Sequence, residues 1–209
     1  MIYYNLNGSE KKLKANDIFM ITAGAEDIEI NKNELAQRLG VSRGYSDDMI
    51  EKCRKRLMGL LSYKCAYINV PVSFRQENIC DLEFMQVRSR NLYRNLRGCS
   101  RAFVLGVTAG MAVDRELARL RVISEAEYFI TDALASAAVD SFCEYACREL
   151  SRGMDCARRF SPGYGDLELS CQTELLERIN GQGLLGITLT SSYLMVPMKS
   201  ITAIMGIRQ

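Results

Sequence analysis

An uninterrupted run of apolar and small residues at 102–108, AFVLGVT, constrains the fold more than any other segment of this chain. A strand with one exposed face alternates apolar and polar residues, whereas a strand that is buried on both faces is apolar throughout. The run therefore predicts a central strand in a sheet that is covered on both sides. A chain of 209 residues is long enough to supply both covering layers within one domain.

The other strong patterns complete an α/β (α+β) fold in a single domain. Strands are expected near 65–73, 184–190 and 200–207, and together with 102–108 they form a twisted mixed or antiparallel-rich sheet. Pro71 inside the first of them favours an edge strand or a strand end. Long helices near 125–150 and 170–180 are expected to cover the sheet.

The chain divides into three parts at this level. Residues 1–30 are expected to be extended or to pack as a strand, residues 31–62 are a helical part, and residues 63–209 form the α/β core. Helix-capping patterns support these divisions, because Ser and Asn side chains accept hydrogen bonds from the first free amides of a helix. The expected caps are Asn31, Ser46 and Ser170, and a short helix is expected from Ser89 to Leu96.

Composition excludes several classes of function. The chain has no histidine, which rules out Ser-His-Asp and Cys-His catalysis, histidine-containing zinc sites and a histidine ligand to a corrin or haem. Its 27 basic and 25 acidic residues give a net charge of +2, which is typical neither of a nucleic-acid-binding tail nor of an acidic protein. Because it shows no membrane-length apolar stretch and no signal-peptide pattern, we expect a cytoplasmic protein without a membrane partner.

The eight cysteines are scattered and include no Cys-x-x-Cys pair. This spacing is unlike that of a zinc knuckle, a thioredoxin-like redox pair or a ferredoxin-type cluster. Only Cys143 and Cys147 are close in sequence, four residues apart on one face of a predicted helix. We expect buried or half-buried thiols that are reduced and free of metal.

Five arginines and no acidic residue lie between residues 86 and 113. This is the only stretch that suggests a phosphate or nucleic-acid surface. Aromatic interleaving goes no further than Tyr93, so nucleic acid is not an expected partner. Binding with a steep salt dependence would be needed to support such a role.

Four short motifs resemble the activation domain of cobalamin-dependent methionine synthase. Residues 159–164, RFSPGY, resemble the R-x-x-P-G-Y signature of the loop that binds S-adenosylmethionine in that family. Residues 107–110 resemble its V-T-A-G, residues 141–145 are similar to its helix segment around A-F-A-E, and residues 195–202 match its M-x-P-x-x-S-V-S. The four occur in the family's order and span roughly half of the chain.

The resemblance implies a fold like that of the methionine synthase activation domain and a role in vitamin B12 chemistry. The chain would be a free-standing activation subunit that binds S-adenosylmethionine and supports reductive remethylation of cobalamin. The cobalamin would be carried by a partner, either a methionine synthase lacking its own activation domain or another corrinoid methyltransferase, and a flavodoxin-like protein would donate the electron. The chain would not act alone, and no residue of it is expected to be catalytic or to bind metal.

The resemblance also implies roles for individual residues. Arg159 would pair with the methionine carboxylate of S-adenosylmethionine, since a guanidinium binds a carboxylate through two hydrogen bonds. Ser161 and the backbone around Gly163 would contact the adenosyl portion. Tyr164 would line the mouth over which the corrin docks, and Glu144 would face the sulfonium or the amine.

Two departures from the family favour an alternative function. The family's N-terminal arm, with an aspartate that contacts S-adenosylmethionine, has no counterpart, and Met205 and Gly206 stand where the family has an aromatic pair. These two residues and Tyr193 are further candidates for the pocket wall. The alternative is a non-catalytic scaffold that docks a corrinoid protein and has lost S-adenosylmethionine binding. In that case Arg159 and Tyr164 belong to an ordinary stiff turn.

Overall fold

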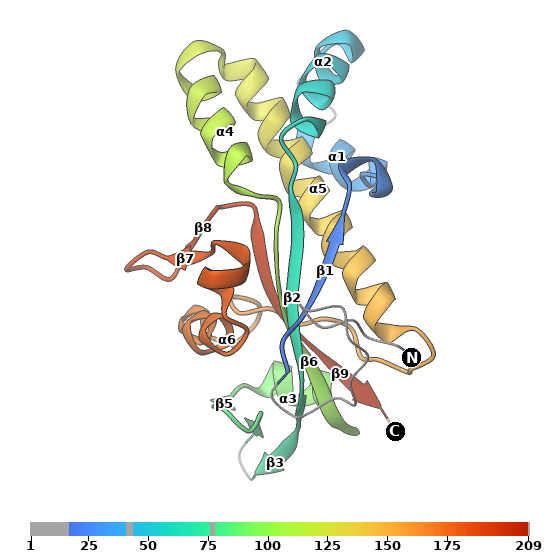
Figure 1. The fold of residues 1–209 in the computed structure, drawn as a ribbon, viewed down its shortest axis with the longest axis vertical. Coiled ribbons are helices and arrows are strands. Elements are labelled where there is room, and N and C mark those ends of the chain that lie inside the picture. Colours follow the sequence, from blue (N-terminus) through green and yellow to red (C-terminus); the bar gives the residue numbers. More distant parts are fainter. Residues whose placement is uncertain (1–16, 41–43, 76–77, 209) are drawn as a thin grey trace.

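A four-stranded antiparallel sheet runs through the centre of the molecule in the order β1-β2-β6-β9 (Figure 1). The computed structural model describes residues 17–40, 44–75 and 78–208. All neighbouring strands of this sheet are antiparallel, which confirms the predicted α/β class with an antiparallel-rich sheet. The strands are β1 (Phe19–Ala23), β2 (Tyr63–Pro71), β6 (Cys99–Thr108) and β9 (Ser200–Arg208).

The apolar run at 102–108 forms most of β6, which lies between β2 and β9. All residues of the run 102–108 are buried, and its apolar side chains alternate between two hydrophobic cores on opposite faces of the sheet. The prediction of a central strand buried on both faces is therefore confirmed. One core includes Phe103, Leu105 and Val107, and the other includes Ala102 and Val104.

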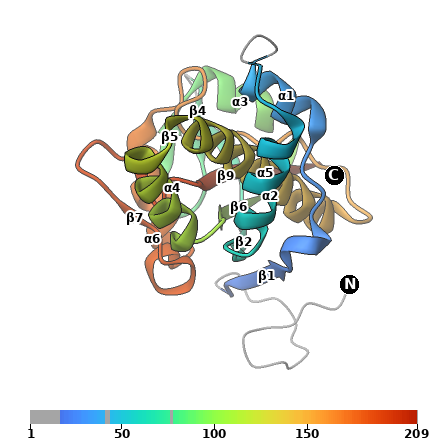
Figure 2. The ribbon, with the colours of Figure 1, turned by 90° about the horizontal axis from the view of Figure 1, so that it is seen from above.

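The long helix α5 (Glu125–Ser151) covers one face of the sheet. Figure 1 shows three shorter helices around its upper part, and in the view from above α5 lies between α4 and α2 (Figure 2). Under α5, the ring of Phe142 stacks on Tyr63 of β2 with ring centroids 4.7 Å apart. The shorter helices are α1 (Lys32–Leu39), α2 (Asp47–Met58) and α4 (Met111–Ile123).

Two short helices and two small sheets cover the opposite face. Leu92, Leu96 and Leu175 from these helices are fully buried against β6 and β9. Within the described ranges, no helix is both long and apolar enough to cross a bilayer. The helices are α3 (Arg90–Leu96) and α6 (Gln172–Arg178), and the small sheets comprise β3 (Ser73–Arg75), β4 (Ile79–Asp81), β5 (Gln86–Arg88), β7 (Thr188–Leu189) and β8 (Met195–Val196).

Several local predictions are confirmed. Asn31 and Ser46 cap α1 and α2 through their side-chain oxygens, and the short helix expected from Ser89 to Leu96 is α3, which Ser89 caps. Pro71 is the last residue of β2, so the strand-end alternative is confirmed. The edge-strand alternative does not hold, because β2 lies between β1 and β6. Of the N-terminal segment 1–30, residues 19–23 form the edge strand β1, whereas residues 1–16 lie outside the described part of the chain.

The predicted strand at 184–190 is wrong. Gly181–Leu185 forms a π-helical turn, and only Thr188–Leu189 is extended, pairing with β8 outside the main sheet. Leu185 and Ile187 are nevertheless buried in the core on this face of the sheet, and a Cβ added at Gly106 of β6 would lie 3.2 Å from Cδ1 of Leu185. Periodicity cannot distinguish this arrangement from a strand, because a short apolar run needs only burial.

The predicted cap at Ser170 is also wrong. A 3-10 turn, Leu169–Cys171, precedes α6, which begins at Gln172. The Ser170 hydroxyl donates to the Glu168 carboxylate, 3.2 Å away, instead of accepting from the helix. The helix expected near 170–180 exists, but it ends at Arg178.

Candidate functional site

The segment that leads into the RFSPGY motif covers the open edge of the central sheet. An edge strand presents backbone groups that need partners. The Ala157 amide donates to the Gly206 carbonyl of β9 over 2.8 Å, and Phe160 and Ile204 exchange two hydrogen bonds of 2.8 Å. These bonds fix the start of the motif beside β9. The local sequence of the motif does not predict this position, because it depends on pairing with a strand distant in sequence.

The far end of the motif is anchored to α3. The Asp166 carboxylate accepts from the Ser89 hydroxyl (2.6 Å) and from the backbone amides of Arg90 (2.8 Å) and Asn91 (3.1 Å). A carboxylate at a helix N-terminus satisfies amides that have no partner within the helix. Asn95 holds the other end of the segment, because its side-chain amide donates to the Arg158 carbonyl over 2.9 Å.

Acidification is expected to weaken the Asp166 anchor. Hydrogen bonds from Ser89, Asn91 and Arg90 lower the pKa of Asp166 from 3.8 to about 2. A carboxylate with a lowered folded-state pKa stabilises the fold above its unfolded pKa, and this contribution disappears as the pH falls through the folded value. In urea unfolding, the stability difference between the wild type and Asp166→Asn should be full above about pH 5 and shrink between about pH 4 and 2.

Glu177→Gln, at an exposed position on α6, is the matched control for the Asp166 experiment. Its stability is expected to track that of the wild type over the same pH range, because the Glu177 carboxylate takes part in no hydrogen bond or ion pair among the described residues. A gap between the wild type and Asp166→Asn that is the same at pH 6 and pH 3 would contradict the anchoring role.

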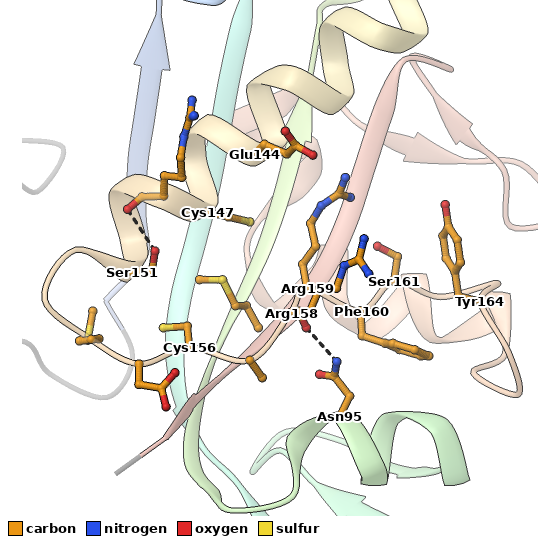
Figure 3. Close-up of a pocket in the computed structure, with 15 residues that line it drawn as sticks. Asn95, Glu144, Cys147, Ser151, Cys156, Arg158, Arg159, Phe160, Ser161 and Tyr164 are labelled. Carbon is orange, nitrogen blue, oxygen red and sulfur yellow. Dashed lines mark hydrogen bonds between the residues drawn. The ribbon is translucent and has the colours of Figure 1, made fainter. Parts of the chain in front are cut away.

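A cavity of about 950 Å³ lies between the second half of α5, the segment 154–164 and β9 (Figure 3). This volume is in the range of small-molecule binding sites. Five of the residues proposed for ligand binding line it, although they come from three elements far apart in the sequence. They are Glu144, Arg159, Ser161, Tyr164 and Met205.

The other proposed residues lie outside the cavity wall. The Gly163 amide is used within the loop, where it donates to the Leu167 carbonyl over 2.8 Å. Gly206 faces the opposite side of the sheet, since a Cβ added there would lie 2.5 Å from the sulfur of Cys99. Tyr193 lies in the connection between β7 and β8 and lines neither this cavity nor its neighbour.

An ion-pair network holds Arg159 in place. Its Nη2 lies 3.0 Å from Oδ1 of Asp140 on α5, and the other oxygen of Asp140 lies 2.7 Å from Nη2 of Arg38. Arg38 pairs in turn with Glu34 at 2.8 Å within α1. Sequence reasoning missed Asp140, although its position four residues before Glu144 places both on one face of α5.

The wall of the cavity carries charged side chains of both signs. Glu144 is exposed on α5, and no ion pair among the described residues involves it. Arg159, on the facing segment, presents a guanidinium whose side chain is 25% exposed. Phe160 and Met205 add apolar surface to the same wall. The cavity is therefore suited to a zwitterionic ligand with an apolar portion.

A second cavity, of about 450 Å³, lies on the other side of the same loop. It shares Arg159, Ser161 and Tyr164 with the first and includes Lys199. The Lys199 ammonium is already bonded to Asp132 (2.7 Å) and to a serine hydroxyl of α5 (2.8 Å). The loop thus forms a partition between two hollows, and its arginine is accessible from both.

The five arginines of the arginine-rich stretch line neither of these two cavities. Arg90, Arg94 and Arg97 are exposed along α3, while the leucines of the same helix are buried. Arg101 donates to the side chain and carbonyl of Asn69 (2.8 and 2.9 Å).

Comparison with known proteins bears on the fold. No protein-family model and no curated protein matches the chain. Among solved structures, the chain is similar to the MetH reactivation domain in a crystal structure bound to AdoHcy, with a TM-score of 0.65 over 98% of this chain and 79% of that chain. At 12% identity the similarity concerns the fold, and it confirms the activation-domain-like architecture predicted from the four motifs.

Proposed function

We propose that this protein is a free-standing activation subunit that binds S-adenosylmethionine and supports reductive remethylation of cobalamin on a separate protein. The observation that carries this proposal is that Glu144 of α5 and Arg159 of the RFSPGY motif line the same cavity. S-adenosylmethionine carries a negative carboxylate and two positive groups, the amine and the sulfonium, on an adenosyl body, so each sign of charge has an oppositely charged side chain in this cavity. The AdoHcy bound to the structurally similar domain supports the same ligand class.

Arg159 is suited to holding the ligand carboxylate without losing its present partner. A guanidinium has five N–H donors in a fixed plane, and the bond to Asp140 uses one of its nitrogens. The remaining donors stay available for a carboxylate, while Asp140 restricts the orientation of the side chain. Binding then requires little ordering of Arg159, which favours affinity.

The remaining roles follow from the walls of the cavity. The Glu144 carboxylate stabilises the positive sulfonium or amine by Coulomb attraction, and Met205 and Phe160 remove the ligand's apolar portion from water. Ser161, which is 8% exposed, supplies a hydroxyl at the loop. These groups orient the methyl donor, and orientation alone supplies a large part of catalysis in a reaction between two held partners.

The cobalamin would reach this site on a corrinoid partner and supply the metal centre that accepts the methyl group. A flavodoxin-like partner would supply the electron. Three exposed apolar side chains on or beside the RFSPGY loop favour docking of a large partner at this loop. Clusters of exposed apolar side chains are uncommon on protein surfaces that bind no partner. The three side chains are Tyr164, Leu194 and Met198, each exposed by more than half.

Calorimetry of the full chain with S-adenosylmethionine and with AdoHcy tests the proposal. One site is expected to bind each ligand, and adenosine alone is expected to bind more weakly because it lacks the groups that Arg159 and Glu144 hold. If the unmutated protein binds neither ligand but does bind a corrinoid methyltransferase, the scaffold alternative holds instead. A nucleic-acid role would require affinity that falls steeply with salt, and a weak, flat response excludes it.

A further inference from the structure

The smaller cavity, on the other side of the RFSPGY loop, has walls that the larger cavity lacks. Its volume of about 450 Å³ lies in the range of small-molecule binding sites. The middle of α5, the loop itself and residues between 194 and 202 form these walls, and α1 contributes Arg38. Figure 1 shows the β7–β8 hairpin, to which the first of these residues belong, projecting from the side of the sheet. The two cavities therefore differ in most of their lining residues, although both include Arg159, Ser161 and Tyr164.

Positive charge dominates the wall of the smaller cavity. Among the described residues, three cationic side chains line it, Arg38, Arg159 and Lys199, together with one carboxylate, Asp140. Both oxygens of that carboxylate are already bonded to guanidinium groups, Oδ1 to Arg159 (3.0 Å) and Oδ2 to Arg38 (2.7 Å). The other acidic partners of Arg38 and Lys199 lie outside this wall. The wall therefore has a formal excess of two positive charges.

Each of the three cations keeps N–H donors for a ligand. Arg159 uses only Nη2 within the described part of the chain, and Arg38 uses Nε and Nη2, so Nη1 of each arginine is available. The Lys199 ammonium has three protons and makes two hydrogen bonds. Its side chain is only 11% exposed, so little water competes for the remaining proton. Ionic hydrogen bonds strengthen where water is excluded, which favours binding of an anion here.

The remaining lining indicates what else the ligand carries. Val139, Leu169 and Ile201 give apolar surface, and Met195 adds a flexible thioether side chain. Such surface favours an aliphatic chain over a small inorganic anion, whose hydration it cannot replace. An amine finds no free carboxylate in this wall, because the one carboxylate there is bonded twice. The larger cavity differs, since Glu144 lines it and makes no ion pair among the described residues.

We propose that the smaller cavity is a second binding site, which takes an aliphatic monocarboxylate that carries no amine. The carboxylate would lie among Arg38, Arg159 and Lys199, and the aliphatic chain would lie against the apolar side chains of the wall. The three cations come from α1, from the RFSPGY loop and from the residue before β9. Only the folded chain brings them to one cavity, so no local motif in the sequence predicts this site.

Occupation of the second site has a consequence that rests on the proposed function. Arg159 lines both cavities, so the carboxylate of S-adenosylmethionine and the carboxylate of the second ligand would compete for its donors. The bond to Asp140 restricts how the guanidinium can turn to serve both. The second ligand is therefore expected to lower the affinity for S-adenosylmethionine, and by linkage the effect is reciprocal.

Calorimetric titration of the full-length chain with sodium hexanoate at pH 7 tests the proposal. Hexanoate is expected to bind at one site, and hexanamide, which has the same chain and no charge, is expected to bind at least about tenfold more weakly. Equal binding of the two would show a merely apolar hollow and overturn the proposal, as would a folded protein that does not bind hexanoate. Inorganic phosphate is expected to bind more weakly than hexanoate, and tighter binding of phosphate would contradict the ligand class.

One substitution and a matched control assign the binding to this cavity. Lys199→Met removes the ammonium and keeps a side chain of similar length, so the affinity for hexanoate is expected to fall about tenfold. Lys64→Met is the control, because Lys64 is exposed on β2 and lines neither cavity. Equal effects of the two substitutions would indicate a general loss of positive charge and contradict the proposal. The comparison of hexanoate with hexanamide uses the unmutated protein and decides the matter if Lys199→Met does not fold.

Glu144→Gln separates this site from the proposed function. Of the two cavities, Glu144 lines only the larger one, so its substitution should weaken S-adenosylmethionine binding and leave hexanoate binding unchanged. If hexanoate binds and S-adenosylmethionine does not, the proposed function fails and the second site stands. If Glu144→Gln and Lys199→Met each weaken both ligands to the same extent, the two cavities form one site, and the proposal of a second site is overturned.

Discussion

Replacing Arg159 by alanine is expected to weaken S-adenosylmethionine binding by about 1.5–3 kcal/mol, the usual worth of a charge-assisted hydrogen bond. This corresponds to a Kd that rises roughly tenfold to a hundredfold or more. The physical reason is that the ligand carboxylate must leave water to enter the cavity, and a buried carboxylate without a partner is costly. Calorimetry with the wild type and the variant measures the difference.

Arg158→Ala is the matched control for the Arg159 experiment. The Arg158 carbonyl accepts from Asn95, but its side chain takes part in no ion pair among the described residues, so its loss should change the affinity little. Loss of Arg159 leaves Asp140 bonded to Arg38 at 2.7 Å, which keeps the α1–α5 contact. Equal effects of the two arginine changes would point to diffuse electrostatics and against a specific carboxylate partner.

Replacing Phe142 by alanine is expected to lower the free energy of unfolding by about 3–5 kcal/mol, because the deletion leaves a cavity that the core cannot fill. Phe142 is completely buried between α5 and the sheet. Its ring stacks on Tyr63, with centroids 4.7 Å apart, and on Tyr145, with centroids 6.3 Å apart. Urea unfolding followed by circular dichroism measures the loss.

Phe129→Ala provides the control on the same helix. Phe129 is 39% exposed near the start of α5 and packs edge-on against Tyr128 at 5.5 Å. Its removal should cost about 1 kcal/mol or less, since the surroundings and solvent can fill the space. A loss as large as that of Phe142→Ala would show that the core of the protein lies elsewhere than under the middle of α5.

The sequence by itself determined the features that depend on one segment at a time. The apolar run at 102–108 predicts its own burial on both faces, and Asn31 and Ser46 predict helix starts because each cap acts within three residues. The RFSPGY motif also marked the loop that lines the large cavity. These are short-range signals, and the structure agrees with them.

The tertiary structure alone decided how distant segments meet. Gly206 and Met205 are neighbours in sequence, but the pleat of β9 turns only Met205 toward the cavity. Asp166 and Asp140 read as ordinary acidic residues until folding brings one to the N-terminus of α3 and the other to Arg159. Apolar residues of the run at 184–190 are buried in the core beside β6, although the run is not a strand of the main sheet. Burial and pairing between distant segments depend on where each partner segment lies in the fold, and a local sequence pattern does not predict where a distant segment lies.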